Sequence, residues 1–88
     1  MKYRILFKAS ARKELNNLPD RHIEAIDKKI LLLMNNPRSI GYKKLSGILN
    51  LYRVRVMDYR IIYSIHDKIL IIEVIKIAHR KDVYKKSL

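Results

Sequence analysis

The chain has 88 residues, 49% of them hydrophobic, which allows one folded domain over residues 1–88 with a single core layer and excludes a disordered chain. It contains no cysteine, so disulfides, thiol catalysis and zinc–thiolate sites are excluded. Its 20 Lys and Arg residues against 8 Asp and Glu give a net charge of +12, which favours an anionic partner such as RNA, DNA or an acidic protein.

The start of the chain lacks a basic, apolar leader of the kind that targets proteins for export. The longest aliphatic run, Ile69–Ile72, is far shorter than the roughly 18 residues that a membrane span needs. We therefore expect a soluble, cytoplasmic protein that has no contact with a membrane.

A strand and two helices are predicted in the first part of the chain. Residues 3–8 alternate in the period of a β-strand. Ser10 is a candidate N-cap for a short helix that ends before Pro19, and Asp20 is a candidate N-cap for a second helix that ends at residues 35–37. Each helix has an apolar stripe, formed by Ala11, Leu15 and Leu18 in the first and by Ile23, Ile26, Ile30 and Leu33 in the second.

Three strands are predicted in the second part. Residues 37–50 contain both glycines and read as a loop, after which residues 51–57, 59–66 and 69–77 follow the period of two. The last of these strands is apolar on both faces, which favours an interior position in the sheet. The predicted fold class is α+β: an N-terminal strand, a helical hairpin and a three-stranded antiparallel meander, with the helices on one sheet face and the other face open.

The sequence "YRVRVMDYRIIY", residues 52–63, places arginines on one side of a predicted hairpin. Arg53 and Arg55 point to the same face, and a tight turn at Asp58 can bring Arg60 beside them. One interpretation is an ordinary solvated face. The other is a phosphate-binding surface, because guanidinium groups match phosphate oxygens two at a time and like charges this close otherwise cost stability.

Further candidates lie near the C-terminal end. Arg80 follows the last predicted strand and can reach over the sheet face. Tyr84 is either a half-exposed cap on the core or, beside arginines that lower its pKa, a base, and His79 is a rival for that proton transfer. We assign His22, in a helix, and His66, beside a turn, to the surface.

The segments "YRVRVMDYRIIY" and "HRKDVY", together with "ARKELNNLP" and "NNPRSIGYKKLSG", resemble the RelE-like branch of the RelE/ParE toxin superfamily over nearly the whole chain. The resemblance implies the RelE-like microbial RNase fold. It also implies the toxin of a type II toxin–antitoxin system, an mRNA interferase that cleaves mRNA in the ribosomal A site without metal and so inhibits translation.

The resemblance also implies roles for individual residues. Arg60 matches the phosphate-binding arginine, Arg80 the acid or leaving-group stabiliser, and Tyr84 the base. Some branches of the family use a histidine as the base, so His79 remains an alternative. In the expected chemistry the RNA 2′-hydroxyl attacks the adjacent phosphate, and Arg55 joins Arg60 in holding the non-bridging oxygens.

RNA binding is expected from Arg53, which stands where the family has basic residues, and from Lys43 and Lys44 in a basic loop. No cofactor and no metal are expected, since no acidic cluster resembles a magnesium site. The expected partners are the ribosome with its mRNA and a RelB-like antitoxin, acidic and partly disordered when free, through whose complex the toxin would meet operator DNA.

Two other functions compete with this one. The ParE-like branch shares the fold and is a non-enzymatic inhibitor of DNA gyrase, for which the trio Arg60, Arg80 and Tyr84 would be unnecessary. A plain nucleic-acid-binding module would need aromatic side chains on the open face, ready to stack on bases. The hairpin tyrosines Tyr52, Tyr59 and Tyr63 instead share the phase of the predicted core.

Overall fold

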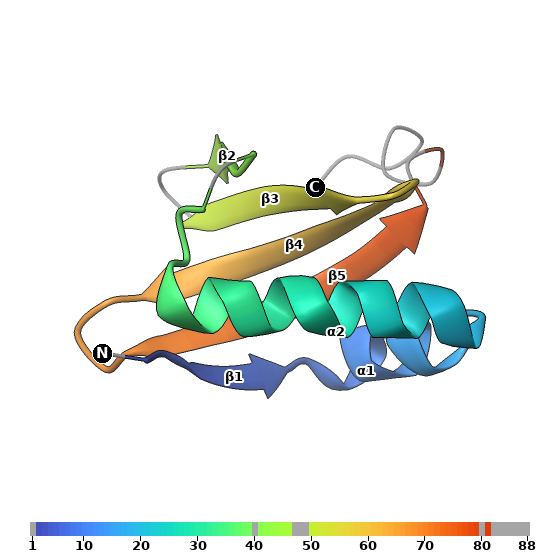
Figure 1. Cartoon of the computed structure of the whole chain (residues 1–88). Coiled ribbons are helices and arrows are strands. Elements are labelled where there is room, and N and C mark those ends of the chain that lie inside the picture. The colour runs from blue at the N-terminus through green and yellow to red at the C-terminus, as the bar shows by residue number, and fades with distance from the viewer. Residues whose placement is uncertain (1, 40, 47–49, 80, 82–88) are drawn as a thin grey trace.

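The computed structural model describes residues 2–39, 41–46, 50–79 and 81. The elements in these residues are β1 (Arg4–Phe7), α1 (Ala9–Asn16), α2 (Asp20–Asn35), β2 (Lys43–Ser46), β3 (Leu51–Val56), β4 (Tyr59–His66) and β5 (Ile71–His79). The strands form one sheet in the order β1-β5-β4-β3-β2 (Figure 1), in which β1 runs parallel to β5 and the other neighbours are antiparallel. The α+β class, the meander and the interior position of the last strand are confirmed.

The structure adds a strand that the sequence did not predict. Residues 43–46, part of the predicted loop 37–50, form β2 and pair with β3 at the edge of the sheet. The side chains of Lys43, Lys44 and Leu45 are exposed, so backbone pairing rather than burial of an apolar face holds this short strand in place. The last strand also begins two residues later than predicted, because Leu70 has a positive φ of 54° in the preceding turn.

Both predicted N-caps are wrong. The N-cap of α1 is Lys8, whose backbone N–H donates to the Val74 carbonyl at 2.9 Å. The pairing of β1 with β5 therefore continues up to the start of the helix, and Ser10 lies inside the first helical turn. The N-cap of α2 is Pro19. Asp20 is the first helical residue, where its negative charge still favours the positive end of the helix dipole.

The core lies between the two helices and one face of the sheet. Figure 1 shows α2 lying across that face. Both predicted helical stripes enter the core, and Tyr52 and Tyr63 are buried in it as their phase indicated. The buried cluster consists of Ala11, Leu15, Ile26, Ile30, Leu33, Tyr52, Val54, Ile61, Tyr63, Ile65, Ile72, Val74 and Ile77. Each fully buried large aliphatic side chain contributes about 1.5–3 kcal/mol, so this cluster fixes which sheet face the helices cover.

Helix α1 also covers a free edge of the sheet. β1 pairs with β5 only as far as Val74, so the outer edge of β5 continues beyond it. Glu14 accepts a hydrogen bond there from the Ile77 backbone N–H at 3.0 Å and another from Lys76 Nζ at 3.0 Å. This contact satisfies a backbone donor that has no strand partner.

Candidate nucleic-acid interface

The arginines of the predicted hairpin lie side by side on the sheet face opposite the core. In the pairing of β3 with β4, Arg55 stands directly opposite Arg60, and Arg53 stands opposite Ile62. Lys43 of β2 stands opposite Arg53 on its other side. Because directly opposed residues share a face, these four cations occupy one surface, which we call the arginine face.

This face is less open than the sequence predicted. Arg55 is exposed and Arg53 half-buried, but Arg60 is only 1% exposed. Ile62 and Ser64, which follow Arg60 on the same face of β4, are also buried, as is Ala78 opposite Arg60, and none of them belongs to the core cluster. The expectation of an open face is therefore wrong along β4. The most accessible cations are those of β2 and β3.

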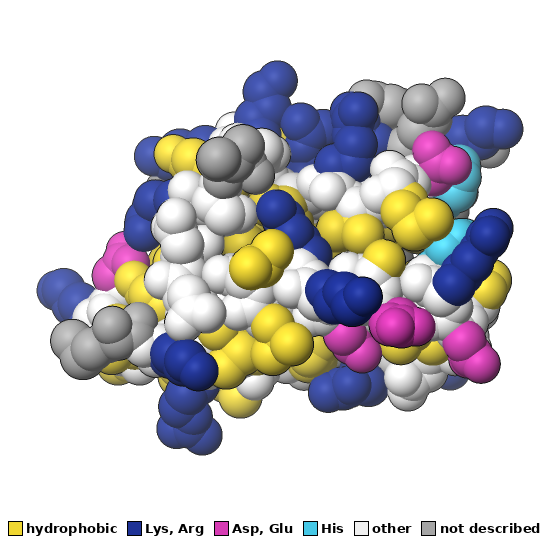
Figure 2. Space-filling model, in the orientation of Figure 1, with side chains coloured by type: hydrophobic (Ala, Val, Ile, Leu, Met, Phe, Trp, Pro, Cys, Tyr) yellow, Lys and Arg dark blue, Asp and Glu magenta, His cyan; other side chains and the backbone are white. Residues whose placement is uncertain are grey.

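Three of the four cations of the arginine face make no ion pair with a described acid. Among the described residues, no ion pair joins Arg53, Arg55 or Lys43 to a carboxylate. Figure 2, viewed from the α2 side, shows Lys and Arg side chains gathered along the edge where β2 and β3 lie, and Asp and Glu mainly near the start of α2. This separation produces a positive potential at one side of the molecule.

Two predicted site residues point away from this face. His79 stands opposite Tyr59, whose ring packs on the core, so its imidazole lies on the helix side. The two rings meet edge to face with centroids 5.5 Å apart, and the His22 ring also packs against Tyr59, with centroids 5.1 Å apart. Lys44 stands opposite the buried Tyr52 and so differs in phase from Lys43. The structure therefore does not bring His79 or Lys44 to the arginines.

Arg80 and Tyr84 lie outside the described residues. The roles assigned to them, and to the arginines and lysines, stay predictions. His22 is half-buried and not a plain surface residue, whereas His66 is exposed as expected.

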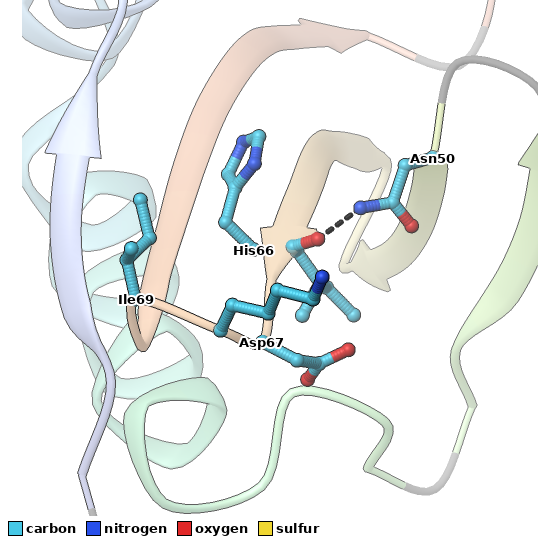
Figure 3. A pocket seen from close by; sticks show the side chains of 6 residues that line it. Asn50, His66, Asp67 and Ile69 are labelled. Carbon is cyan, nitrogen blue, oxygen red and sulfur yellow. Dashed lines mark hydrogen bonds between the residues drawn. The ribbon is translucent and has the colours of Figure 1, made fainter.

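A pocket that sequence reasoning missed lies at the other end of the arginine face (Figure 3). It measures about 440 Å³ and is lined by Asn50, Ile65, His66, Asp67, Lys68 and Ile69. We call it the turn pocket, since three of its six lining residues, Asp67, Lys68 and Ile69, belong to the β4–β5 turn. The signal was present in the sequence: counting in steps of two from Arg60 along β4 reaches His66.

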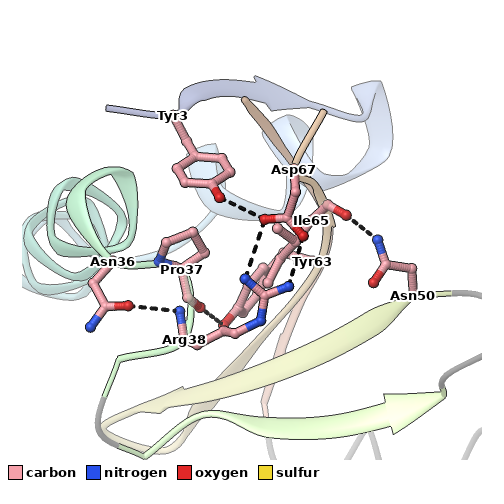
Figure 4. Close-up of polar contacts among 8 residues, drawn as sticks. All are labelled: Tyr3, Asn36, Pro37, Arg38, Asn50, Tyr63, Ile65 and Asp67. Carbon is pink, nitrogen blue, oxygen red and sulfur yellow. Dashed lines mark hydrogen bonds and ion pairs between the residues drawn. The ribbon is translucent and has the colours of Figure 1, made fainter. Parts of the chain in front are cut away.

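The wall of the turn pocket is anchored by a polar network that joins three distant segments (Figure 4). Asp67 accepts hydrogen bonds from Arg38 at 2.9 and 3.3 Å and from the Tyr3 hydroxyl at 2.6 Å. The bonds from Arg38 and Tyr3 lower the pKa of Asp67, and the carboxylate in turn raises the pKa of Tyr3. Asn50 donates from its side-chain amide to the Ile65 carbonyl.

Tyr63 connects the core to the segment that precedes β2. Its hydroxyl donates to the Pro37 carbonyl at 2.6 Å, and burial raises the pKa of this phenol. A neutral, buried phenol with its donor satisfied is a structural group. It holds in place the residue next to Arg38.

The described part of the chain holds no cluster of three or more His, Asp or Glu side chains arranged to bind a metal ion. In the same residues, neither helix has both the length and the apolar character of a membrane span.

The fold and the site thus define a small basic α+β protein whose sheet is covered by helices on one face and carries a ladder of cations on the other. The sequence model of the ParE toxin of type II toxin–antitoxin systems (parDE) matches residues 5–84. The chain belongs to this family, and it is a RelE-like toxin of the RelE/ParE superfamily.

Individual relatives agree with this assignment. The toxin RelE of Mycobacterium tuberculosis is 31% identical over 86 residues, covering 97% of this chain and 89% of that protein. Among solved structures, the RelE–RelB complex of Pyrococcus horikoshii is similar with a TM-score of 0.80 and 32% identity, over 91% of this chain and 97% of that one. The isolated RelE toxin of Escherichia coli has a TM-score of 0.78 and 28% identity, over 94% and 92% of the two chains.

Proposed function

We propose that this toxin is a ribosome-dependent endoribonuclease that cleaves mRNA in the A site and so inhibits translation. One observation carries the proposal: Arg55 and Arg60 oppose each other, the Lys43–Arg53 pair lies beside them, and no acid pairs with Arg53, Arg55 or Lys43 among the described residues. Like charges opposed across strands destabilise a sheet, so a bound phosphate chain explains why they are kept. Similarity to RelE toxins supports the same reading.

The proposed chemistry uses the RNA's own nucleophile. A base removes the proton of the 2′-hydroxyl, the 2′-oxygen attacks the adjacent phosphorus, and the bond to the 5′-oxygen breaks. The products are a 2′,3′-cyclic phosphate and a 5′-hydroxyl, formed after the leaving oxygen gains a proton. Arg55 and Arg60 bind the non-bridging oxygens and Arg80 stabilises the leaving oxygen. The buried guanidinium of Arg60 must become accessible before it can do so.

The base in this proposal is Tyr84. His79 is the alternative, but its place on the helix side, packed against Tyr59, makes it less suited to reach a phosphate held at Arg55. Arginine is a weak acid, so charge stabilisation dominates and the ribosome supplies the in-line orientation of the substrate. No metal enters the proposed mechanism.

The proposed partner is a RelB-like antitoxin. The solved structures of similar toxins include RelE–RelB complexes from Pyrococcus horikoshii and Escherichia coli. With a net charge of +12, the toxin suits an acidic, partly disordered chain that covers its basic face. Through that complex the toxin would meet operator DNA. The single toxin domain, residues 1–88, would act in the cytoplasm, where ribosomes translate.

The alternative is a gyrase inhibitor of the ParE type, which the name of the matching family model favours. An inhibitor of that type needs a docking surface but no convergent arginines. Arg55 and Arg60 therefore favour the nuclease.

The decisive experiment is cell-free translation of a defined mRNA with the purified toxin, followed by primer extension. We expect new 5′ ends within the A-site codon of translating ribosomes, and none on the same mRNA without ribosomes. A 2′-deoxy nucleotide at the cut position should abolish cleavage there, because the nucleophile is missing. Intact mRNA together with inhibited gyrase supercoiling would instead assign the protein to the alternative function.

A further inference from the structure

The turn pocket has no part in the proposed cleavage chemistry, yet it lies on the same sheet face. His66 follows Arg60 by six residues on β4, and residues an even number of steps apart on a strand point to the same side. At the usual rise of a strand this places the two side chains roughly 20 Å apart. Because Ile62 and Ser64 between them are buried, the route from Arg55 to the turn pocket follows β3, past Arg53 to Asn50, which lines the pocket.

Among the residues that line the turn pocket the unpaired charge is positive, and the nearest acid outside the lining on this face is Glu73 of β5, opposite Ser64. Asp67, the acid in its lining, is engaged by Arg38 and Tyr3, so its charge is already balanced. Lys68 is exposed and makes no ion pair with another described residue. An anionic group that enters the pocket thus meets an available ammonium instead of a repelling carboxylate.

The pocket also offers surfaces on which a base can stack. The imidazole of His66 is held at Nε2 by a 2.9 Å hydrogen bond with Ser64 Oγ, and Ser64 is only 4% exposed, so the ring is attached to a rigid strand. Ile69 beside it is 63% exposed, an apolar side chain without a core to cover (Figure 3). A flat ring and an apolar side chain next to a cation are the elements with which proteins bind single-stranded nucleotides.

We propose that the turn pocket binds one nucleotide of single-stranded RNA, with its base against His66 and Ile69 and its phosphate at Lys68. The bound nucleotide lies a few positions along the strand from the linkage held at Arg55. This inference rests on the proposed function, because it requires the same RNA to cross the arginine face. In this proposal the turn pocket contributes to the affinity for the RNA substrate and helps to select the linkage that is cut.

The test measures how much affinity the protein gains from a longer RNA. The full chain is titrated, by fluorescence anisotropy, into labelled 2′-O-methyl oligonucleotides of about three and about eight residues, which cannot be cut. We expect the double variant His66→Ala, Lys68→Gln to reduce the advantage of the longer RNA about tenfold. Lys28→Gln is the control, because Lys28 is also an exposed cation but lies on α2, on the helix side of the sheet, and should leave that advantage unchanged.

A second readout separates this inference from the proposed function. In the primer-extension assay, the double variant should need about ten times more toxin for half-maximal cleavage than wild type. If wild type cuts and the double variant equals it in both assays, the pocket inference fails alone. If wild type does not cut, the proposed function fails first. If the double variant keeps its RNA affinity and loses binding to an acidic peptide, the pocket belongs to a protein partner and the inference is overturned.

Discussion

Arg55 of β3 stands directly opposite Arg60 of β4, so two guanidinium groups share one cross-strand position without the separation that like charges favour. Arg55 is exposed and pairs with no described carboxylate, whereas Arg60 is buried. If the function needs both charges, their repulsion lowers the stability of the sheet while their presence supports activity.

Arg55→Gln should separate these two effects. Removing one of two opposed like charges should raise the free energy of unfolding by about 0.2–1 kcal/mol, seen as a higher urea midpoint. Cleavage of mRNA on ribosomes should fall about 100-fold, because a donor to the phosphorane is lost. Arg21→Gln, an exposed arginine on α2, is the control and should change neither quantity. Full activity in Arg55→Gln would assign this arginine to an ordinary solvated face.

Arg60→Lys tests the shape of the group at constant charge. Lysine keeps the positive charge but cannot form two parallel hydrogen bonds to a phosphate, so cleavage should be lost nearly as completely as in Arg60→Ala and Arg80→Ala. The measurement is growth arrest after induction, with primer extension on cellular mRNA. Thermal melting checks that each variant is folded. A toxic, cutting Arg60→Ala protein would contradict the role of this residue.

Substitutions of the neighbouring residues Lys43 and Lys44 should affect RNA binding to different extents. Lys43 shares the arginine face with Arg53, whereas Lys44 stands opposite the buried Tyr52. Lys43→Ala should therefore weaken RNA binding and reduce its dependence on salt by one counterion, a change of about 0.7 in the logarithmic slope, and Lys44→Ala should do less. Titration at several salt concentrations measures both slopes. Equal slopes would show that the phase of β2 does not govern contact with RNA.

The base can be identified with two conservative changes. Tyr84→Phe removes a hydroxyl and should lower the cleavage rate about 100-fold or more, the usual share of a general base. His79→Phe keeps an aromatic ring against Tyr59 and should retain cleavage. Single-turnover rates on programmed ribosomes provide the measurement. Loss of cleavage in His79→Phe, with an unchanged melting temperature, would reverse the assignment.

Asp67→Asn should alter the dependence of stability on pH. Hydrogen bonds from Arg38 and Tyr3 lower the pKa of Asp67 in the folded protein, so the unfolded chain takes up this proton more readily. The stabilisation is present above the ordinary carboxyl pKa of about 3.9 and is lost as the pH falls through the lower folded value. Urea midpoints of wild type should exceed those of Asp67→Asn at pH 6–7 and converge with them near pH 2. The difference should be small, because the ion pair is exposed to solvent.

Much of the fold could be predicted from the local periodicity of apolar residues. The stripes that end at Leu18 and Leu33 predicted both helices, and the period of two predicted β3 and β4, because these periods distinguish a helix from a strand. They did not predict that β4 is buried on both faces. The strand β2 and the N-cap of α1 were missed for one reason. Their conformation depends on partners far along the chain, Arg53 for Lys43 and Val74 for Lys8, and no local pattern encodes these.

For the candidate site, too, local pattern predicted some features and missed those that depend on distant segments. Period-two counting put Arg53 and Arg55 on one face, and the structure agrees. It could not show that Arg60 is buried or that His79 packs on the helix side, since burial depends on what covers a strand and the phase of β5 depends on an irregularity in its pairing with β4 between Ile62 and Tyr63.

The sequence by itself determined the class of protein, the excess of positive charge and the arginines of the hairpin, since composition and short-range periodicity are properties of the chain alone. Only the tertiary structure decided that Lys43 joins these arginines, that His79 does not, and that a pocket lies at the far end of the same face. Those relationships arise from hydrogen-bond register between strands. A shift of one residue in that register would move every side chain of a strand to the opposite face.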